Sequence, residues 1–427
     1  GVADSERAFA ALALGVLGDG DASQALTDIV RRGRGERDIA SAALYALGLL
    51  GDARSQVFLE YFVLAPGHDD VLRSVAAQAL AYSGRSESVD TFARLLKDPD
   101  VNVRRSAAIA FGRIDFVSAF RRDLESAQAE LKSEFSGDGL SPAAAARFEG
   151  YLSRMRLKAD EDELRLNQVK KHVVETLLDA GLSDADIMVR NFSALSLGQI
   201  GGEPAEAALI DLVDNAGNDS HRAFASLALA LMPSADGRDA IRRNVIRQRI
   251  DADTRAAMLL ALGLLEDQEI SGYALNRLRS LGHADLAAYS AIALGLIDEQ
   301  KASRPLREVV LGQSHPELKR PFGLALGLLG LDRTIEDLGS LLDSGASAET
   351  RIRAAAALSA IRDHRSIKQL VSGAQSRKRP PKDLVLAAYV RAIGVLGERG
   401  DLPVLSGRFR DLNYLTPVPV LVEFALL

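Results

Sequence analysis

Two stretches of the sequence carry the same pattern: DVNVRRSAAIAFGRID at residues 100–115 and DIMVRNFSALSLGQIG at residues 186–201. Each opens with an aspartate, has an arginine four residues later, and closes on a motif that begins with a small residue, an apolar residue and a glycine. Between these points apolar residues recur every three or four positions, as on the buried face of an α-helix. An aspartate at the first position can cap such a helix. Each stretch therefore predicts one amphipathic helix with a defined start.

The end of this pattern recurs along the chain as a six-residue motif, Ala-Leu-Gly-x-Leu-Gly. Eleven copies are found, and their third positions lie 31–35 residues apart except for one gap of 86. A fixed period of this length is typical of repeats that each form a helical pair and stack on their neighbours. The third position falls at residues 15, 48, 81, 112, 198, 230, 263, 295, 327, 359 and 394.

Glycine occupies two positions of the motif for two different reasons. The third position is glycine in eight copies, although glycine inside a helix costs about 1 kcal/mol relative to alanine. This recurrence predicts that a neighbouring helix approaches closely at that point. The sixth position suits the left-handed residue that ends a helix. It is glycine in six copies, at Gly18, Gly51, Gly84, Gly201, Gly330 and Gly397.

A cation stands eight residues before the small third position in eight repeats, and an acid precedes it by two to four residues. We expect the acid to cap the helix, and the cation to reach the acid or the cap of an adjacent repeat. The result would be a structural ladder; a row of anion-binding cations is the alternative. The cations are Arg7, Arg73, Arg104, Arg190, Arg222, Arg255, Lys319 and Arg351. The acids are Asp4, Asp70, Asp100, Asp186, Asp219, Asp253, Glu317 and Glu349.

A second amphipathic segment follows the motif, as at residues 25–30 and 208–213. We name the helix that carries the motif the A helix and the following one the B helix. Residues 100–114 and 186–200 resemble the HEAT-like repeats of phycobilisome-lyase-type proteins and many bacterial scaffolds. The resemblance covers almost all of the chain except the insertion described below, and it implies an all-α fold, a right-handed α-α superhelix (a HEAT/armadillo-like solenoid) of about eleven helical pairs. It implies no particular activity, because this repeat hosts many functions.

Residues 116–166 interrupt the period and predict a helical hairpin inserted into the stack. Apolar residues from Phe120 to Leu131 are spaced as on one face of a first helix, and Ser141-Pro142 marks the start of a second. The hairpin either folds back on the stack or projects as an arm that grips a partner or a second copy. The predicted organisation is N-terminal repeats at 1–115, the insertion at 116–166 and C-terminal repeats at 167–427, the last of them truncated.

Composition limits the classes of function. Cysteine is absent, which excludes disulfides, thiolate metal sites and a cysteine nucleophile. The net charge of −6 gives no general attraction to nucleic acid or to anionic membranes. No apolar run reaches the roughly 18–20 residues that span a bilayer. The chain starts at Gly1, so its start looks processed or engineered; a removed signal peptide would favour an exported or periplasmic location, and the cytoplasm is expected otherwise.

The residues predict no catalytic, cofactor or metal site. The histidines form no His-x-x-x-His pair. HEAT-like deoxyhypusine hydroxylases carry His-Glu pairs for a di-iron centre, and HEAT-like alkylpurine DNA glycosylases use aromatic residues that include Trp. This sequence has neither a His-Glu dipeptide nor a Trp. The acidic run at residues 160–163 is interpreted as a solvated helix surface rather than a metal site. The six histidines are His68, His172, His221, His283, His315 and His364.

Three basic stretches are candidates for contact with a partner. The largest lies on and beside one B helix, and the others are residues 31–37 and the loop at residues 377–382. If B helices line the concave face of the stack, the largest group points toward a bound partner. The alternative is exposed charge that serves solubility. The candidate partner-binding residues are Arg238, Arg242, Arg243, Arg247 and Arg249.

The sequence therefore predicts a non-catalytic scaffold that binds a protein or peptide partner through the solenoid surface, with the B-helix face in contact. Two alternatives stay open. Fold analogy allows a bilin-lyase-like or chaperone-like HEAT protein, which would carry a chromophore. The basic residues allow nucleic-acid binding at a local patch, which would weaken steeply with salt. The sequence leaves the oligomeric state and the identity of the partner undecided.

Overall fold

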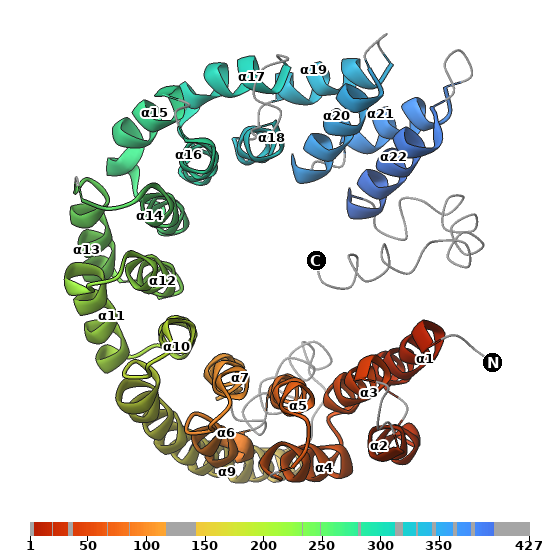
Figure 1. Cartoon of the computed structure of the whole chain (residues 1–427), viewed down its shortest axis with the longest axis vertical. Helices are drawn as coiled ribbons and strands as arrows, with labels where there is room; N and C mark the ends of the chain where they lie inside the picture. The colour runs from red at the N-terminus through yellow and green to blue at the C-terminus, as the bar shows by residue number, and fades with distance from the viewer. Residues whose placement is uncertain are drawn as a thin grey trace. The chain divides into compact units, whose positions relative to one another are not determined.

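Every regular element is helical in the part of the chain that the computed structural model describes (Figure 1). The predicted all-α fold is therefore confirmed, with helices that pack in sequence as in a HEAT-repeat solenoid. The chain forms two compact units, Gly1–Gln248 (unit 1) and Arg249–Leu427 (unit 2), and each is considered by itself. The structure describes residues 4–18, 20–32, 37–65, 67–84, 86–116, 142–232, 234–247, 249–280, 283–311, 319–329, 332–343, 347–361, 365–376 and 381–396.

In unit 1, A and B helices alternate along the chain, and successive A helices pack against each other. Most A helices also pack against the B helix that precedes them. The A helices are α1 (Asp4–Leu17), α3 (Arg37–Leu50), α5 (Asp70–Tyr82), α7 (Val101–Phe111), α10 (Ile187–Ile200) and α12 (Asp219–Ala230). The B helices are α2 (Ala22–Arg32), α4 (Ala53–Leu64), α6 (Val89–Leu95, after the 3-10 turn η1, Ser86–Ser88), α9 (Pro142–Thr176, continued by the π-helical turn η2, Leu177–Gly181), α11 (Glu203–Asn215) and α13 (Ala235–Val245).

Unit 2 has the same alternation. Its A helices are α14 (Ala252–Leu264), α16 (Ala284–Leu296), α18 (Lys319–Leu328), α20 (Ala348–Ile361) and α22 (Asp383–Leu396). Its B helices are α15 (Ser271–Ser280), α17 (Ser303–Leu311), α19 (Asp332–Asp343) and α21 (Arg365–Ala374), and the short 3-10 turns η3 (Gln268–Ile270) and η4 (Gln300–Ala302) precede α15 and α17. Buried apolar residues from α19 to α22 form one continuous core, with Tyr389 fully buried in it.

Most third-position glycines of the described residues lie where one A helix meets the next, whereas a Cβ added at Gly394 would have no atom within 4 Å. A Cβ added at Gly263 would lie 2.7 Å from Cα of Ala293, and one at Gly15 would lie 2.6 Å from Cα of Ala46. These distances are too short for any side chain, so the predicted close approach is confirmed at these positions. The partner in each case is the first-position alanine of the following motif. The same arrangement joins Gly48 to Ala79, Gly198 to Ala228 and Gly295 to Ala325.

The sixth position of the motif adopts the left-handed conformation that the sequence predicts. Gly18, Gly51 and Gly84 have φ between 58° and 70°. In two copies of unit 2 the same position is not glycine, yet Glu266 (φ 53°) and Asp298 (φ 55°) take the same conformation. The turn therefore forms at these two positions although their side chains disfavour it, whereas Asp115 at the sixth position after α7 does not have positive φ.

The 86-residue gap in the period does not interrupt the stack of A helices in unit 1. α7 packs directly against α10, and Ser196 Oγ donates a hydrogen bond of 2.6 Å to the carbonyl of Ala108. α9 runs without a break across residue 166, and its buried stripe includes Ala159, Leu166 and Val173. The first arm of the predicted hairpin falls at residues 117–141, outside the described residues.

Within unit 1 the A helices lie on the inner side of the bend and the B helices on the outer side (Figure 1). The expectation that B helices line the concave face is therefore wrong for this unit. The physical reason is the spacing of the rows. Neighbouring A helices meet at glycine and alanine, so the distance between successive A helices is short. The stack therefore bends toward the side of the A helices.

None of the described helices is both long enough and apolar enough to cross a membrane.

Candidate binding surface

Large apolar side chains are exposed at one position of the A helices, the fourth position of the six-residue motif. Isolated exposed apolar residues are ordinary on protein surfaces, but apolar residues that recur at one motif position of several repeats are a candidate contact surface. We name these residues the apolar row. It comprises Val16, Leu49, Tyr82 and Leu231 in unit 1, which are 45–75% exposed, and Leu264 and Leu328 in unit 2, which are 48 and 41% exposed.

Further apolar side chains lie half-buried on the A helices of unit 1. Phe192 on α10 and Phe224 on α12 meet edge to face, with ring centres 6.3 Å apart. Leu195 and Leu227 are half-buried one turn further along the same two helices. Aromatic and aliphatic side chains held by their neighbours in this way lose little entropy when a partner covers them. The A helices of unit 1 thus present apolar groups suited to a protein contact.

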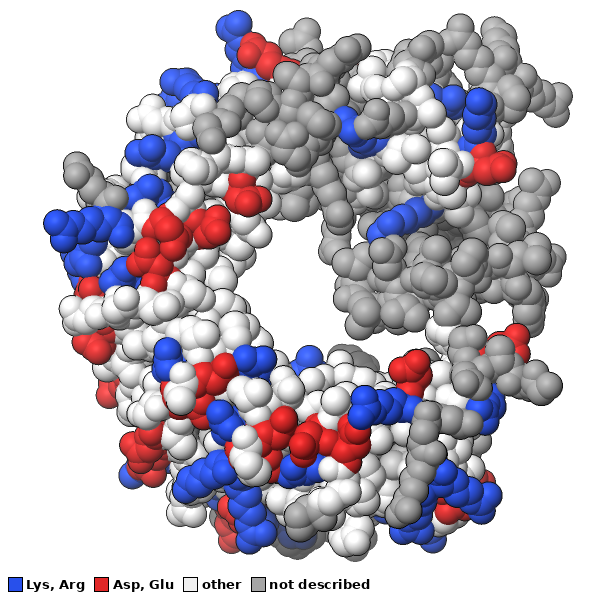
Figure 2. All heavy atoms as spheres, viewed as in Figure 1, with Lys and Arg blue, Asp and Glu red and all other residues white. Residues whose placement is uncertain are grey.

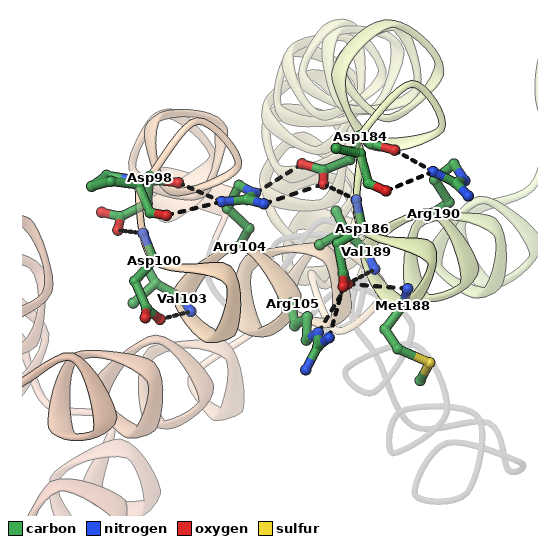
Figure 3. Close-up of polar contacts among 12 residues, drawn as sticks. Asp98, Asp100, Val103, Arg104, Arg105, Asp184, Asp186, Met188, Val189 and Arg190 are labelled. Atoms are coloured by element: carbon green, nitrogen blue, oxygen red, sulfur yellow. Dashed lines mark hydrogen bonds and ion pairs between the residues drawn. The ribbon is translucent and has the colours of Figure 1, made fainter.

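The predicted cation ladder is formed in detail where α7 meets α10 (Figure 3). Arg104 Nε donates to Asp184 Oδ2 at 2.9 Å and thereby joins two successive repeats. The same guanidinium donates to the carbonyls of Asp98 and Pro99, in the loop that precedes its own helix. Arg190 holds the corresponding loop of the next repeat, because it donates to the carbonyls of Asp184 and Ala185. One arginine thus fixes its own loop and one neighbouring repeat.

A second arginine strengthens the same junction. Arg105 Nη2 donates to Asp186 Oδ2 at 2.7 Å, while Asp186 Oδ1 accepts from the backbone N–H groups of Met188 and Val189 and caps α10. The hydrogen bond from Arg105 is the main cause that lowers the pKa of Asp186 to about 2, and the two capping N–H groups lower it further, against the opposing effect of desolvation. Asp186 is therefore a carboxylate over the whole physiological range.

The remaining ladder positions make different contacts. Arg73 pairs with Asp70 and Asp98, Arg222 donates to Asp219 at 2.8 Å, and Arg351 donates to the Tyr389 hydroxyl at 2.9 Å. Arg7 and Arg255 also have interaction partners. The side chains of Lys319, Asp4 and Glu349, and all of Glu317, lie outside the described part of the chain.

The capping residue is not always the predicted acid. Asp100 and Asp186 cap their helices as predicted. At three other A helices the cap lies one or two residues earlier, so that Asp70, Asp219 and Asp253 fall inside the helix. The caps there are Asp69, Asn218 and Asp251.

The candidate partner-binding arginines of unit 1 lie on or next to α13, in the outer row of B helices. Arg242 pairs with Asp239 at 3.1 Å, and Arg243 with Asp214 at 3.3 Å. Arg247 donates to the carbonyl of Asp214 at 3.0 Å. Arg238 is half-buried, and its Nε has no hydrogen-bond partner among the described residues. Arg249 belongs to unit 2.

Three of the five arginines, Arg242, Arg243 and Arg247, thus have acidic or carbonyl partners within unit 1. Over unit 1, Figure 2 likewise shows basic and acidic atoms side by side on the face drawn, without a broad field of one sign. Of the other basic stretches, Arg37 pairs with Asp69, and residues 377–380 lie outside the described part.

The described histidines have structural surroundings. His221 is 6% exposed and lies 2.9 Å, Nδ1 to Oδ1, from Asn191, and burial lowers its pKa. His68 stacks on Phe62 with ring centres 4.1 Å apart. His172 and His283 are exposed, whereas His315 and His364 fall outside the described residues. Among the residues described, no group of three or more His, Asp or Glu side chains is arranged to hold a metal ion.

The apolar row is the feature that the sequence pattern contained but did not identify. The motif leaves its fourth position unspecified, although that position is apolar in most copies. Successive residues of an α-helix are rotated by about 100° about its axis. The residue after the third-position glycine therefore points away from the helix contact and onto the surface. Arg105 was missed because it directly follows the recurring cation, Arg104.

Comparison with known proteins gives the family of the repeat. The family model for HEAT repeats matches residues 63–131. No curated protein sequence matches the chain. One similar solved structure is the complex of CpcE and CpcF of phycocyanin lyase from Nostoc sp. PCC7120, at 15% identity and a TM-score of 0.38, covering 72% of this chain and 94% of that one. Another is human deoxyhypusine hydroxylase in complex with glycerol, at 16% identity and a TM-score of 0.26, covering 70% of this chain and 98% of that one. The match to the repeat model, together with the sequential packing of paired helices, identifies the chain as a HEAT-repeat protein.

Proposed function

We propose that the chain is a non-catalytic scaffold that binds a protein partner through its A-helix surface. The observation that carries the proposal is the apolar row, with an exposed apolar side chain at the same motif position in four of the six A-helix repeats of unit 1. A surface of this kind gains free energy when a partner covers it, at about 25 cal/mol per Å² of apolar area. HEAT repeats commonly serve protein binding, in agreement with this proposal.

In the proposed scaffold the recurring cations have a structural role. Arg104 and Arg105 pair with acids of the adjacent repeat, so they hold the A helices in register and are not available to a ligand. We assign them, with the other ladder residues, to the scaffold. Arg238, Arg242, Arg243 and Arg247 are not part of the proposed partner contact, because they lie on the B side and three of them have acidic or carbonyl partners.

The finer architecture is also a proposal. About eleven helical pairs would form a right-handed superhelix, interrupted once by a helical hairpin that ends in α9. The long α9 helix, 35 residues, and the direct packing of α7 against α10 support an insertion that leaves the stack intact. Within the proposed scaffold, the hairpin is an addition to the stack and not a part of it.

The test compares matched substitutions on the two rows of unit 1. A double variant of the apolar row, Leu49→Glu with Leu231→Glu, adds charge to the A side. A control, Val57→Glu with Tyr61→Glu, adds the same charge to α4 in the B row, where the two side chains are 68 and 67% exposed. Proteins captured from a cell lysate by the tagged full chain are identified by mass spectrometry.

The proposal expects a specific protein that the wild type and the α4 control capture equally and that the apolar-row variant loses. Loss with the α4 control alone would overturn it. An absorbance spectrum of the purified chain tests the chromophore alternative, since a bound bilin absorbs visible light. Capture of nucleic acid that disappears at physiological salt would mark only nonspecific attraction.

A further inference from the structure

The apolar row of unit 1 is interrupted at two consecutive repeats, by Arg113 after α7 and by Gln199 on α10. Arg113 follows α7 at the motif position that holds Leu49 and Tyr82 in the two preceding repeats. Its Cζ lies 4.3 Å from the centre of the Tyr82 ring, a cation–π contact. Arg113 is exposed, and within the described residues no carboxylate lies at ion-pair distance from it. It differs in this from Arg104 and Arg105, whose charges are both compensated by acids.

The position of Arg113 is fixed from three helices. The backbone N–H of Asp115 donates to the carbonyl of Gly84 at 2.8 Å, which ties the turn after α7 to the turn after α5. Tyr45 on α3 packs edge to face on Tyr82, with ring centres 6.1 Å apart. The guanidinium is therefore held in place before any ligand arrives.

Tyr45 is itself locked by a chain of hydrogen bonds. Its hydroxyl donates to Gln78 Oε1 at 2.6 Å, and Gln78 Nε2 donates to Ser106 Oγ at 3.1 Å. Burial raises the pKa of Tyr45, the nearby Tyr82 adds to the rise, and the charge of Arg113 opposes it. The polar groups beneath Tyr82 and Arg113, those of Tyr45, Gln78 and Ser106, are thus paired with each other. The Arg113 guanidinium is left as the charge available to a partner.

We propose that Tyr82 and Arg113 bind an acidic side chain of the protein partner, while an adjacent apolar side chain of that partner packs on Leu49 and Tyr82. This inference rests on the proposed function and specifies the chemistry of the partner at one point of the surface. A guanidinium stacked on a ring presents its N–H edge to a carboxylate in the geometry for two parallel hydrogen bonds. The ring also shields one face of the ion pair from water, which strengthens it relative to a fully exposed pair.

The probe is a displayed library of short random peptides, selected on the immobilised full chain. Enriched peptides are synthesised with a fluorophore, and their dissociation constants are measured by fluorescence anisotropy. We expect enrichment of sequences in which Asp or Glu neighbours Leu, Ile or Phe. Replacing that acid by its amide, or Arg113 by alanine, should each weaken binding about tenfold, and the two changes together should be no worse than either alone.

Matched variants separate the roles of charge and ring. Tyr82→Phe keeps the stacking surface and should bind as the wild type does, whereas Tyr82→Ala should weaken binding. Arg94→Ala, an exposed arginine on α6 in the B row, is the control and should leave binding unchanged. A thermal melt of each variant checks that the exposed substitutions leave the fold intact.

The contrary outcomes distinguish the two proposals. Peptides that bind the apolar row, as shown by weakening with Leu231→Glu, but that show no preference for an acid or no response to Arg113→Ala would overturn this inference and leave the proposed function standing. Peptides weakened only by Val57→Glu with Tyr61→Glu would contradict both. A selection that returns no binding peptide counts against the inference as well.

Discussion

Most third-position glycines lie at close contacts between A helices, although a glycine weakens the helix that contains it. Gly263 and Gly272 illustrate the difference between a glycine that a contact requires and one that it does not. A Cβ at Gly263 would lie 2.7 Å from Cα of Ala293, whereas no atom lies within 4 Å of a Cβ at Gly272 on α15. The two positions offer a direct comparison of packing with helix propensity.

Gly263→Ala should lower the free energy of unfolding by about 1–3 kcal/mol, because the backbone of α16 must move to admit the methyl group. Gly272→Ala should raise it by roughly 0.5–1 kcal/mol through helix propensity alone. Urea denaturation followed by circular dichroism measures both. Equal effects of the two substitutions would contradict the close contact between α14 and α16.

The left-handed turn after the A helix gives a second residue-level prediction. Glu266 has φ 53°, a conformation that is unfavourable for residues with a Cβ. Gly51 has φ 58° at the equivalent position. Glu266→Gly should therefore stabilise the protein by about 0.5–1 kcal/mol, and Gly51→Ala should destabilise it by about 1 kcal/mol. Denaturation midpoints of the two variants should move in opposite directions; a shared direction would refute the explanation.

At the scale of the helices, the junction of α7 and α10 depends on Asp186, which caps α10 and pairs with Arg105. Its folded pKa of about 2 is lower than the value of about 3.9 for an unfolded aspartate, so its contribution to stability is complete above pH of about 4. The contribution falls as the pH drops below that value and is lost near pH 2.

Asp186→Asn should therefore lower the melting temperature at pH 7, and the difference from the wild type should shrink between about pH 4 and pH 2. Thermal melts across this range, in buffers of constant ionic strength, measure the difference. Glu161→Gln on the exposed side of α9 is the control and should have little effect at pH 7. A difference that stays constant with pH would show that the charge of Asp186 does not matter.

The sequence was sufficient to predict the helices and their closest contacts. The recurring motif, with glycine at its third position in eight of eleven copies, indicates where A helices meet, because a Cβ at positions such as Gly15, Gly48 and Gly263 would collide with the next A helix. It was not sufficient to choose the capping residue. Asp69 and Asp70 are equally able to cap α5, and the choice depends on where the backbone of the preceding loop enters the helix.

The candidate surface was harder to predict, because it depends on whether the A helices or the B helices lie on the inner side of the bend. That choice follows from the spacing of A helices relative to B helices, and no single repeat contains this information. The arginines on α13 looked like a cationic patch in the sequence, but Asp214, about thirty residues earlier, lies beside Arg243 and Arg247 in the fold. Long-range pairing of this kind cannot be read from local composition.

At the scale of the whole molecule, the stack of unit 1 is continuous although the sequence between α7 and α10 is long. Arg104 reaches Asp184 across 80 residues of sequence, and Arg105 reaches Asp186 across 81. In a solenoid each repeat is stabilised mainly by its neighbours, so an insertion between neighbours that still touch is dispensable for the fold. The buried residues of α9 include Ala159, Leu166 and Val173, and this helix packs against α6 and α10.

Deletion of residues 126–158 ends just before these buried residues of α9 and should leave a cooperatively folded protein with a helical spectrum and a melting temperature within a few degrees of the wild type. Val173→Asp is the contrasting variant, since it buries a carboxylate at a position that is fully buried and should cost about 3 kcal/mol or more. If the deletion variant lost its cooperative transition, the insertion would be part of the core.

If it folds, capture of the protein partner decides between the two interpretations of the hairpin: weaker capture favours an arm that grips the partner, and unchanged capture favours a hairpin folded back on the stack.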